Sequence, residues 1–235
     1  MVKNAEAESL AMKVFEDLRF AILNRELAPG TRLKPAELGR ELGVSLGVVR
    51  EALGLLAAKS LVRIDRNRGF HVTTLSLEDL ANLTFARVTN EGAALRLSVQ
   101  RGGVTWESEV LAAHHRLASL PMFLPDGPDL RSEEWARAHL AFHHKLIDAC
   151  GNPILLDICD RLSDAAELYR AWSGVSGREA GRDVVGEHQA LCDAALAHEA
   201  DLAVDLFEKH ISLTQTLLVD SGLASAQDQA AADAS

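Results

Sequence analysis

Two short stretches of helical periodicity lie close together near the N-terminus. Leu38 and Leu42 are four residues apart, which gives a predicted helix over residues 35–42 one apolar face. A second predicted helix, residues 46–57, has apolar residues at spacings of four and three. These residues, its predicted inner stripe, are Val49, Leu53 and Leu56.

The residues between these helices are typical of a tight turn. Gly43 tolerates the left-handed backbone that often ends a helix, and Ser45 is a good N-cap for the next one. Arg50 lies off the apolar stripe and is expected to point outward. Helix, glycine turn, helix is the pattern of a DNA-reading helix-turn-helix. A plain helical hairpin in an all-α core is the alternative.

A short alternating region follows and favours the DNA-binding interpretation. The apolar residues of 61–64 begin a strand, residues 63–69 (RIDRNRG) form a basic hairpin turn, and residues 70–74 alternate like a returning strand. A basic two-stranded flap after a helix-turn-helix predicts a winged helix.

The rest of the chain shows helical periodicity without an alternating strand pattern. Pro121–Pro128 is predicted to be a loop. The sequence therefore predicts a mainly α protein: a winged helix-turn-helix (1–75), an all-α antiparallel helical bundle (76–222) and a disordered tail (223–235). The expected bundle helices are 76–100, 104–119, 131–150, 152–172, 178–198 and 200–222.

Charge is distributed unevenly along the chain. The net charge is −10, but residues 1–74 carry 12 Lys and Arg against 9 Asp and Glu, which is +3. The remainder carries 12 against 25, which is −13. A basic head on an acidic body is compatible with DNA binding at one end, because neutralising phosphates requires local charge.

Other features concern the compartment. Three cysteines form no CxxC pair and are expected to be reduced thiols. The acidic, polar start MVKNAEAES does not resemble a signal peptide, and no apolar run approaches the roughly 20 residues that span a membrane. We therefore expect a cytoplasmic protein without a membrane partner.

Four histidines are candidates for one metal site. His139 and His143 lie four apart on one predicted helix, and His188 and His210 lie on two later helices. Four converging imidazoles suit a divalent transition metal, with zinc the expected ion and nickel the alternative. The competing interpretation is four histidines that are satisfied within the core.

Residues 11–74 resemble the N-terminal domain of GntR-family transcription regulators. The resemblance rests on ELGRELGVSLGVVREALGLLAAKSLV and RNRGFHV; Leu46 stands where the family usually has Arg, and Gly47 where it usually has a polar residue. The resemblance implies double-stranded operator DNA as partner and a homodimer on a palindromic site. The implied DNA-binding residues are Arg40, Ser45, Leu46, Gly47, Val48 and Arg50, with Arg66, Arg68 and Gly69 in the wing.

The second half resembles the FCD ligand-binding domain of the FadR-like branch of that family. The resemblance is carried by residues 139–146 (HLAFHHKL) with Gly151-Asn152, by Glu187-His188, and by His210-Ile211. It implies a metal held by His139, His143, His188 and His210, with His139 replacing the usual Asp. A neutral shell leaves the metal its full charge, which favours an anionic effector.

The resemblance also implies a small carboxylate effector. Arg87 and Glu91 are similar to an R…E pair of the family, although a simple i, i+4 salt bridge explains them equally well. Tyr169 and Arg170 are further pocket candidates. His144 is assigned to the outer surface or to a second layer around the metal. The remaining histidines are expected to be solvated or structural: His71, His114, His115 and His198.

The sequence thus predicts a metabolite-responsive transcription regulator, acting as a repressor, and not an enzyme. A purely structural metal site is one alternative. A metal-dependent hydrolase is another, but the chain has no HExxH motif. Glu187 also lies about 100° around a helix from His188, a poor position for a general base.

Overall fold

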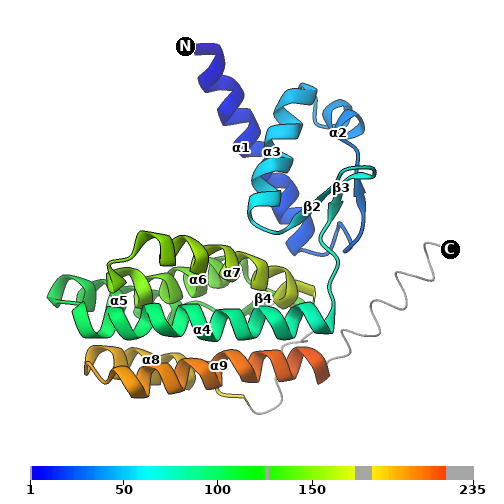
Figure 1. Cartoon of the computed structure of the whole chain (residues 1–235). Coiled ribbons are helices and arrows are strands. Elements are labelled where there is room, and N and C mark those ends of the chain that lie inside the picture. Colours follow the sequence, from blue (N-terminus) through cyan, green and yellow to red (C-terminus); the bar gives the residue numbers. More distant parts are fainter. Residues whose placement is uncertain (1, 125–126, 173–181, 221–235) are drawn as a thin grey trace. The chain divides into compact units, whose positions relative to one another are not determined.

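The computed structural model describes residues 2–124, 127–172 and 182–220 (Figure 1). Contacts group these residues into two compact units. The first contains residues 2–76 together with 164–172, and the second contains residues 77–163 and 182–220. The expected tail after residue 222 lies outside the described residues.

The first unit has the order of elements that the sequence predicts for a winged helix. A three-stranded antiparallel sheet has the order β1-β3-β2, and the β2–β3 hairpin pairs Val62 with Val72 and Asp65 with Gly69. Helix α1 packs on α3, and α2 also contacts α3. The elements are α1 (Val2–Leu23), β1 (Arg32–Leu33), α2 (Pro35–Glu41), α3 (Leu46–Ala58), β2 (Val62–Asp65) and β3 (Gly69–Val72).

The predicted stripe of α3 forms the centre of this unit, since Val49, Leu53 and Leu56 are all fully buried. The expected apolar face of α2 was wrong in one respect, because Leu42 is 39% exposed. Gly39 is buried there instead, and a Cβ on it would lie 3.0 Å from the Val44 carbonyl oxygen. The turn therefore packs against a glycine rather than against a leucine.

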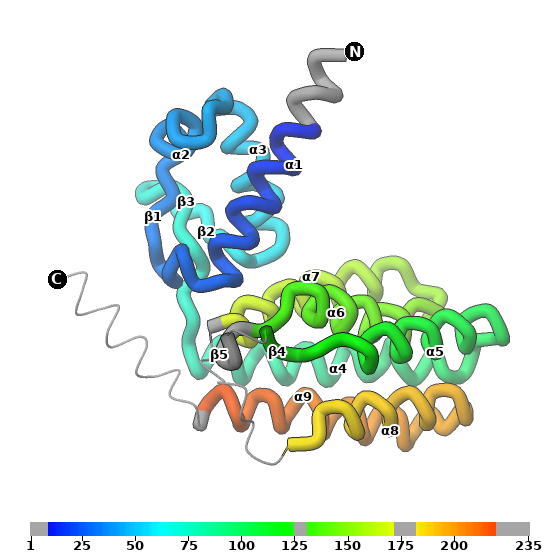
Figure 2. Tube along the Cα trace, turned by 180° about the vertical axis from the view of Figure 1, so that it is seen from behind, coloured from blue at the N-terminus to red at the C-terminus, as the bar shows by residue number. Residues whose placement is uncertain are grey.

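The second unit is a helical bundle. Helices α4 and α9 lie side by side, α8 contacts both α9 and α5, and α6 packs on α5 and α4 (Figures 1 and 2). Its elements are α4 (Leu77–Arg101), α5 (Val104–Ala118), α6 (Glu133–Ile147), a 3₁₀ turn (Asp148–Cys150), α7 (Pro153–Trp172), α8 (Val184–Leu196) and α9 (Ala200–Asp220). Residues 153–163 of α7 are grouped with this second unit, and residues 164–172 with the first.

Two local expectations are corrected in the bundle. The predicted loop at Pro121–Pro128 contains an antiparallel ribbon of β4 (Phe123–Leu124) and β5 (Gly127–Arg131), whose strands are too short and irregular for alternation to reveal them. Helix α8 begins at Val184 rather than at 178, because Asp183 caps it by accepting a hydrogen bond from the Gly186 amide. Residues 178–181 lie outside the described residues.

No helix among the described residues is long and apolar enough to cross a membrane.

Helix α6 carries two of the candidate metal ligands, and its N-cap, Ser132, is expected to stabilise it. Ser132 accepts a hydrogen bond from the Trp135 amide at 3.3 Å. Ser132→Ala should lower the free energy of unfolding by about 1 kcal/mol and the melting temperature by roughly 2–4 °C. Ser108→Ala is the control, because the exposed Ser108 hydroxyl only bonds back to the Val104 carbonyl within α5. Equal melting temperatures for the two variants would contradict the capping role.

Candidate functional site

The structure brings together the four histidines that the sequence singled out. His139 and His143 come from α6, His188 from α8 and His210 from α9. Their side chains are buried, with residue exposures of 7%, 5%, 2% and 5% respectively. One ring nitrogen from each lies within 4.8 Å of those of the others. Helix α6 and the consecutive helices α8 and α9 therefore deliver four nitrogen donors to one buried point.

The donors fit a divalent transition metal. Zinc binds imidazole nitrogen at about 2.0–2.1 Å, so the four donors would draw closer together around an ion, and an ion that takes more than four ligands would keep open positions beside them. His188 Nε2 is fully buried and has no hydrogen-bond partner among the described residues. Burial lowers the pKa of His188 to about 2. The ring is therefore neutral and has a lone pair available, as a metal ligand requires.

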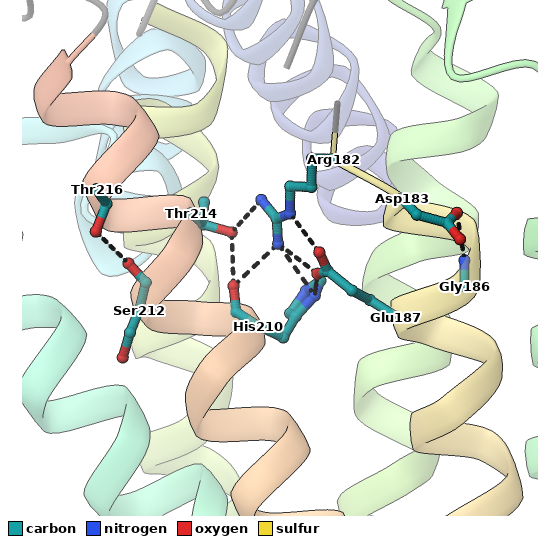
Figure 3. A network of polar contacts seen from close by, with 8 residues as sticks. All are labelled: Arg182, Asp183, Gly186, Glu187, His210, Ser212, Thr214 and Thr216. Atoms are coloured by element: carbon teal, nitrogen blue, oxygen red, sulfur yellow. Dashed lines mark hydrogen bonds and ion pairs between the residues drawn. The ribbon is translucent and has the colours of Figure 1, made fainter. Parts of the chain in front are cut away.

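A polar network stands behind His210, and sequence reasoning missed it (Figure 3). The Nδ1 atom of His210 lies 2.7 Å from Glu187 Oε2. Arg182 donates to both oxygens of that carboxylate, at 2.7 and 2.6 Å. Burial alone would raise the pKa of Glu187, but the hydrogen bonds from Arg182 and His210 outweigh it and hold the pKa at about 2. Glu187 is thus an ionised partner of a candidate ligand.

Aromatic rings form the other side of the cluster. Trp135 stacks on His139 with ring centroids 4.8 Å apart, and the Arg131 guanidinium lies 5.4 Å from the Trp135 ring. Phe142 meets His188 edge-on at 5.6 Å. These contacts restrict ring rotation and exclude water from the donors. Trp106 and Trp135 are both buried.

Arg87 and Glu91 form a buried ion pair on α4. Arg87 Nε lies 2.6 Å from Glu91 Oε1, and Arg87 Nη2 lies 3.0 Å from Oε2. Burial lowers the pKa of His210 most, and the positive charges of Arg182 and Arg87 lower it further. Arg87 is therefore within electrostatic reach of the histidine cluster, and the i, i+4 salt bridge is present.

The other two effector candidates belong to the first contact unit. The Tyr169 hydroxyl accepts a hydrogen bond from the Ser76 amide at 3.4 Å, and Arg170 forms an ion pair with Glu167 on the same helix. The structure does not group them with the four histidines.

Three of the remaining histidines have defined contacts or surroundings in the structure. His144 faces outward and pairs with Asp160 at 3.4 Å, as its position on α6 suggested. His198 bonds to the Val99 carbonyl and to Glu107, so it is structural. His114 is buried against Phe142, and burial lowers its pKa. It lies outside the group of four.

The predicted DNA-binding side chains of the helix-turn-helix are exposed, with one exception. Arg40, Ser45, Leu46, Gly47 and Arg50 are exposed. Val48 is only 7% exposed and packs into the unit, so its side chain offers little surface to DNA. Its amide instead donates to the Ser45 hydroxyl at 3.4 Å, which caps α3.

The wing has the expected basic tip. Arg66 and Arg68 are exposed, and Gly69 has a φ of +85°, a backbone conformation that other residues rarely adopt. Asp65 shapes the turn by accepting from the Asn67 and Arg68 amides. A surface hollow of about 600 Å³ beside the tip adds Arg63 and His71, which were not among the predicted site residues.

Comparison with known proteins supports both halves of this description. Residues 10–72 match the family model "Bacterial regulatory proteins, gntR family", and residues 82–213 match the "FCD domain" model. A structure titled "E. coli McbR/YncC" superposes with a TM-score of 0.70 at 20% identity, covering 90% of this chain and 97% of that one. At this identity the likeness concerns the fold alone.

Two curated relatives match most of the chain. The "Uncharacterized HTH-type transcriptional regulator BphR" of Paraburkholderia xenovorans is 37% identical over 93% of this chain and 89% of the relative. The "HTH-type transcriptional repressor GlaR" of Escherichia coli is 31% identical over 88% of this chain and 94% of the relative. The chain therefore belongs to the GntR family of bacterial regulators and is a DNA-binding transcription regulator with an FCD domain, not an enzyme.

Proposed function

We propose that the protein is a repressor whose operator affinity is controlled by a small carboxylate metabolite bound at a metal held by His139, His143, His188 and His210. The observation that carries this is the convergence of four buried imidazoles from three helices. The resemblance to the repressor GlaR supports the sign of regulation. The metal, zinc or alternatively nickel, would supply a Lewis-acidic centre whose open positions take carboxylate oxygens.

The charges around the cluster favour an anionic effector. The four imidazoles are neutral donors, Arg87 is neutralised by Glu91, and Arg182 is neutralised by Glu187. A bound divalent ion would therefore keep its 2+ charge in a buried environment, where uncompensated charge is costly. An incoming carboxylate would relieve that cost, and Arg87, with Glu91 as its partner, is the candidate for a second anionic group. Tyr169 and Arg170 add no support.

On the DNA side, we propose that a homodimer places one α3 in each half-site of a palindromic operator. Arg40, Ser45, Leu46, Gly47 and Arg50 would face the DNA from the helix-turn-helix. Arg66, Arg68 and Gly69 would approach it from the wing, where both arginines are exposed. The functional boundary between the DNA-binding and effector-binding parts is proposed near residue 75.

A purely structural metal is the second candidate function for the histidine cluster. It is favoured by the depth of burial of all four ligands. It predicts that chelation destabilises the bundle and that no carboxylate changes the melting temperature.

Thermal melting against a panel of small organic and sugar acids separates these functions. An acid at 100 times its Kd should add about 2.7 kcal/mol of stability, which raises the melting temperature by roughly 5–10 °C. The shift should disappear with a chelator, because the acid would bind through the metal. A chelator effect without any acid response would assign a structural role to the metal. No response to either would remove the metal centre from the proposal.

A further inference from the structure

We propose that Glu187 and Arg182 are positioning residues of the metal centre. Glu187 fixes the His210 ring in the tautomer that presents Nε2 to the ion, and Arg182 holds Glu187 in place. This inference rests on the proposed metal centre. Neither Glu187 nor Arg182 is one of the four proposed ligands.

The first step is the tautomer of His210. Both oxygens of the Glu187 carboxylate accept hydrogen bonds from Arg182, so this group is placed as an acceptor, and its Oε2 lies 2.7 Å from His210 Nδ1. If Nδ1 carried a lone pair, two acceptors would face each other at that distance, which is repulsive. Arg182 Nη2 also lies near Nδ1, but at the longer distance of 3.3 Å. Nδ1 therefore carries the proton, and the lone pair is on Nε2.

The second step is the fixation of Glu187. Arg182 binds the carboxylate through two nitrogens, so the carboxylate plane is set by a fork of two hydrogen bonds. The same guanidinium donates to the His210 carbonyl oxygen and to the Thr214 hydroxyl, both at 3.0 Å (Figure 3). Arg182 thus ties the start of α8 to one turn of α9. This grip also keeps the negative carboxylate from rotating toward the ion as an additional ligand.

The third step is the relative placement of the two helices that carry His188 and His210. Glu187 and His188 are neighbours on α8, while His210 lies on α9. The bond from Glu187 to His210 therefore fixes the register of α8 against α9 at the point where each helix delivers a donor. Mutating a carboxylate that accepts the second N–H of a metal-bound histidine typically lowers metal affinity about 10–100-fold.

The test measures two quantities in Glu187→Ala and Glu187→Gln. In the metal-free protein, the ¹⁵N chemical shifts of the His210 ring should report the Nδ1–H tautomer in the wild type and a mixture of tautomers in Glu187→Ala. Zinc titration with a competing chelator should show 10–100-fold weaker binding in Glu187→Ala. Glu187→Gln should restore most of the tautomer preference and part of the affinity, because its amide oxygen still accepts from Nδ1–H. Arg182→Ala should weaken binding by a smaller factor, because Glu187 remains but is no longer held.

Asp183→Ala is the matched control. It removes the N-cap of the same helix, the bond from the Gly186 amide to Asp183 at 2.8 Å, and should cost about 1 kcal/mol without touching His210. Its zinc affinity and His210 shifts should equal those of the wild type. If Glu187→Ala binds zinc as tightly as this control, or if wild-type His210 carries its proton on Nε2, the inference is wrong. Absence of zinc binding in the wild type would instead overturn the metal centre, whereas the tautomer measurement would still stand.

Discussion

Replacing His188 with leucine is expected to destroy metal binding while leaving the metal-free protein at least as stable as before. Loss of a residue that hydrogen-bonds to a metal ligand lowers metal affinity by up to ~100-fold. Zinc affinity should fall further in His188→Leu, because this variant removes a metal ligand itself. Stabilisation by zinc, about 4.1 kcal/mol at 1,000 times the Kd in the wild type, should disappear. Melting with and without zinc measures both effects.

The expected gain in stability of the metal-free His188→Leu protein follows from the burial of His188. Its Nε2 is buried without a hydrogen-bond partner among the described residues, and such a group costs about 1–3 kcal/mol. Leucine fills a similar volume and has no polar atom, so it should relieve that cost. A histidine satisfied within the core would behave differently, because its replacement would lower the stability of the metal-free protein.

His114→Leu is the matched control for this experiment. His114 is also a buried histidine, its Nε2 has no hydrogen-bond partner in the described part of the chain, and it packs against the same Phe142 ring. Since it lies outside the group of four, its loss should leave zinc affinity unchanged. If both variants lost zinc binding equally, the loss would come from altered packing of the bundle and not from removal of a metal ligand.

Replacing Arg50 with alanine is expected to weaken operator binding by about 1–3 kcal/mol per half-site, which is roughly 5–150-fold. Arg50 is exposed on α3, about 100° around the helix from the buried Val49. It is therefore free to contact DNA without loss of the core. Because a dimer would present two copies, the effect on a full palindrome should exceed the effect on a half-site. Binding to duplexes selected from a random pool provides the measurement, since the operator is not needed in advance.

The salt dependence of binding separates two roles for Arg50. A phosphate contact would weaken binding to all sequences alike and reduce the slope of log K against log salt by about 1 per contact, whereas a base contact would relax specificity at one position. Arg116→Ala removes the same charge from an exposed position on α5 and should leave operator binding unchanged. Unchanged affinity in Arg50→Ala at physiological salt would show that this face of α3 is not the DNA-binding face.

The sequence determined the elements of this protein with considerable accuracy. Helical spacing identified α3 and its buried stripe, and the basic turn at residues 63–69 identified the wing, because both patterns are local consequences of backbone geometry. The short ribbon of β4 and β5 was not predicted because its irregular register leaves no alternating pattern. The burial of Val48 was not predicted, because the local sequence pattern does not distinguish an exposed from a buried valine in the first turn of a helix.

For the candidate metal site, the sequence identified the four histidines, and the tertiary structure determined their surroundings. Four histidines in family context were recognisable from their residue type and spacing. Their convergence to within 4.8 Å required α6, α8 and α9 to pack together. The role of Glu187 was hidden for the same reason: its angle on α8 relative to His188 excluded it as a general base, but only the adjacent α9 places His210 where Glu187 can hold it. Distances across helices depend on packing between segments far apart in the chain, which no local pattern encodes.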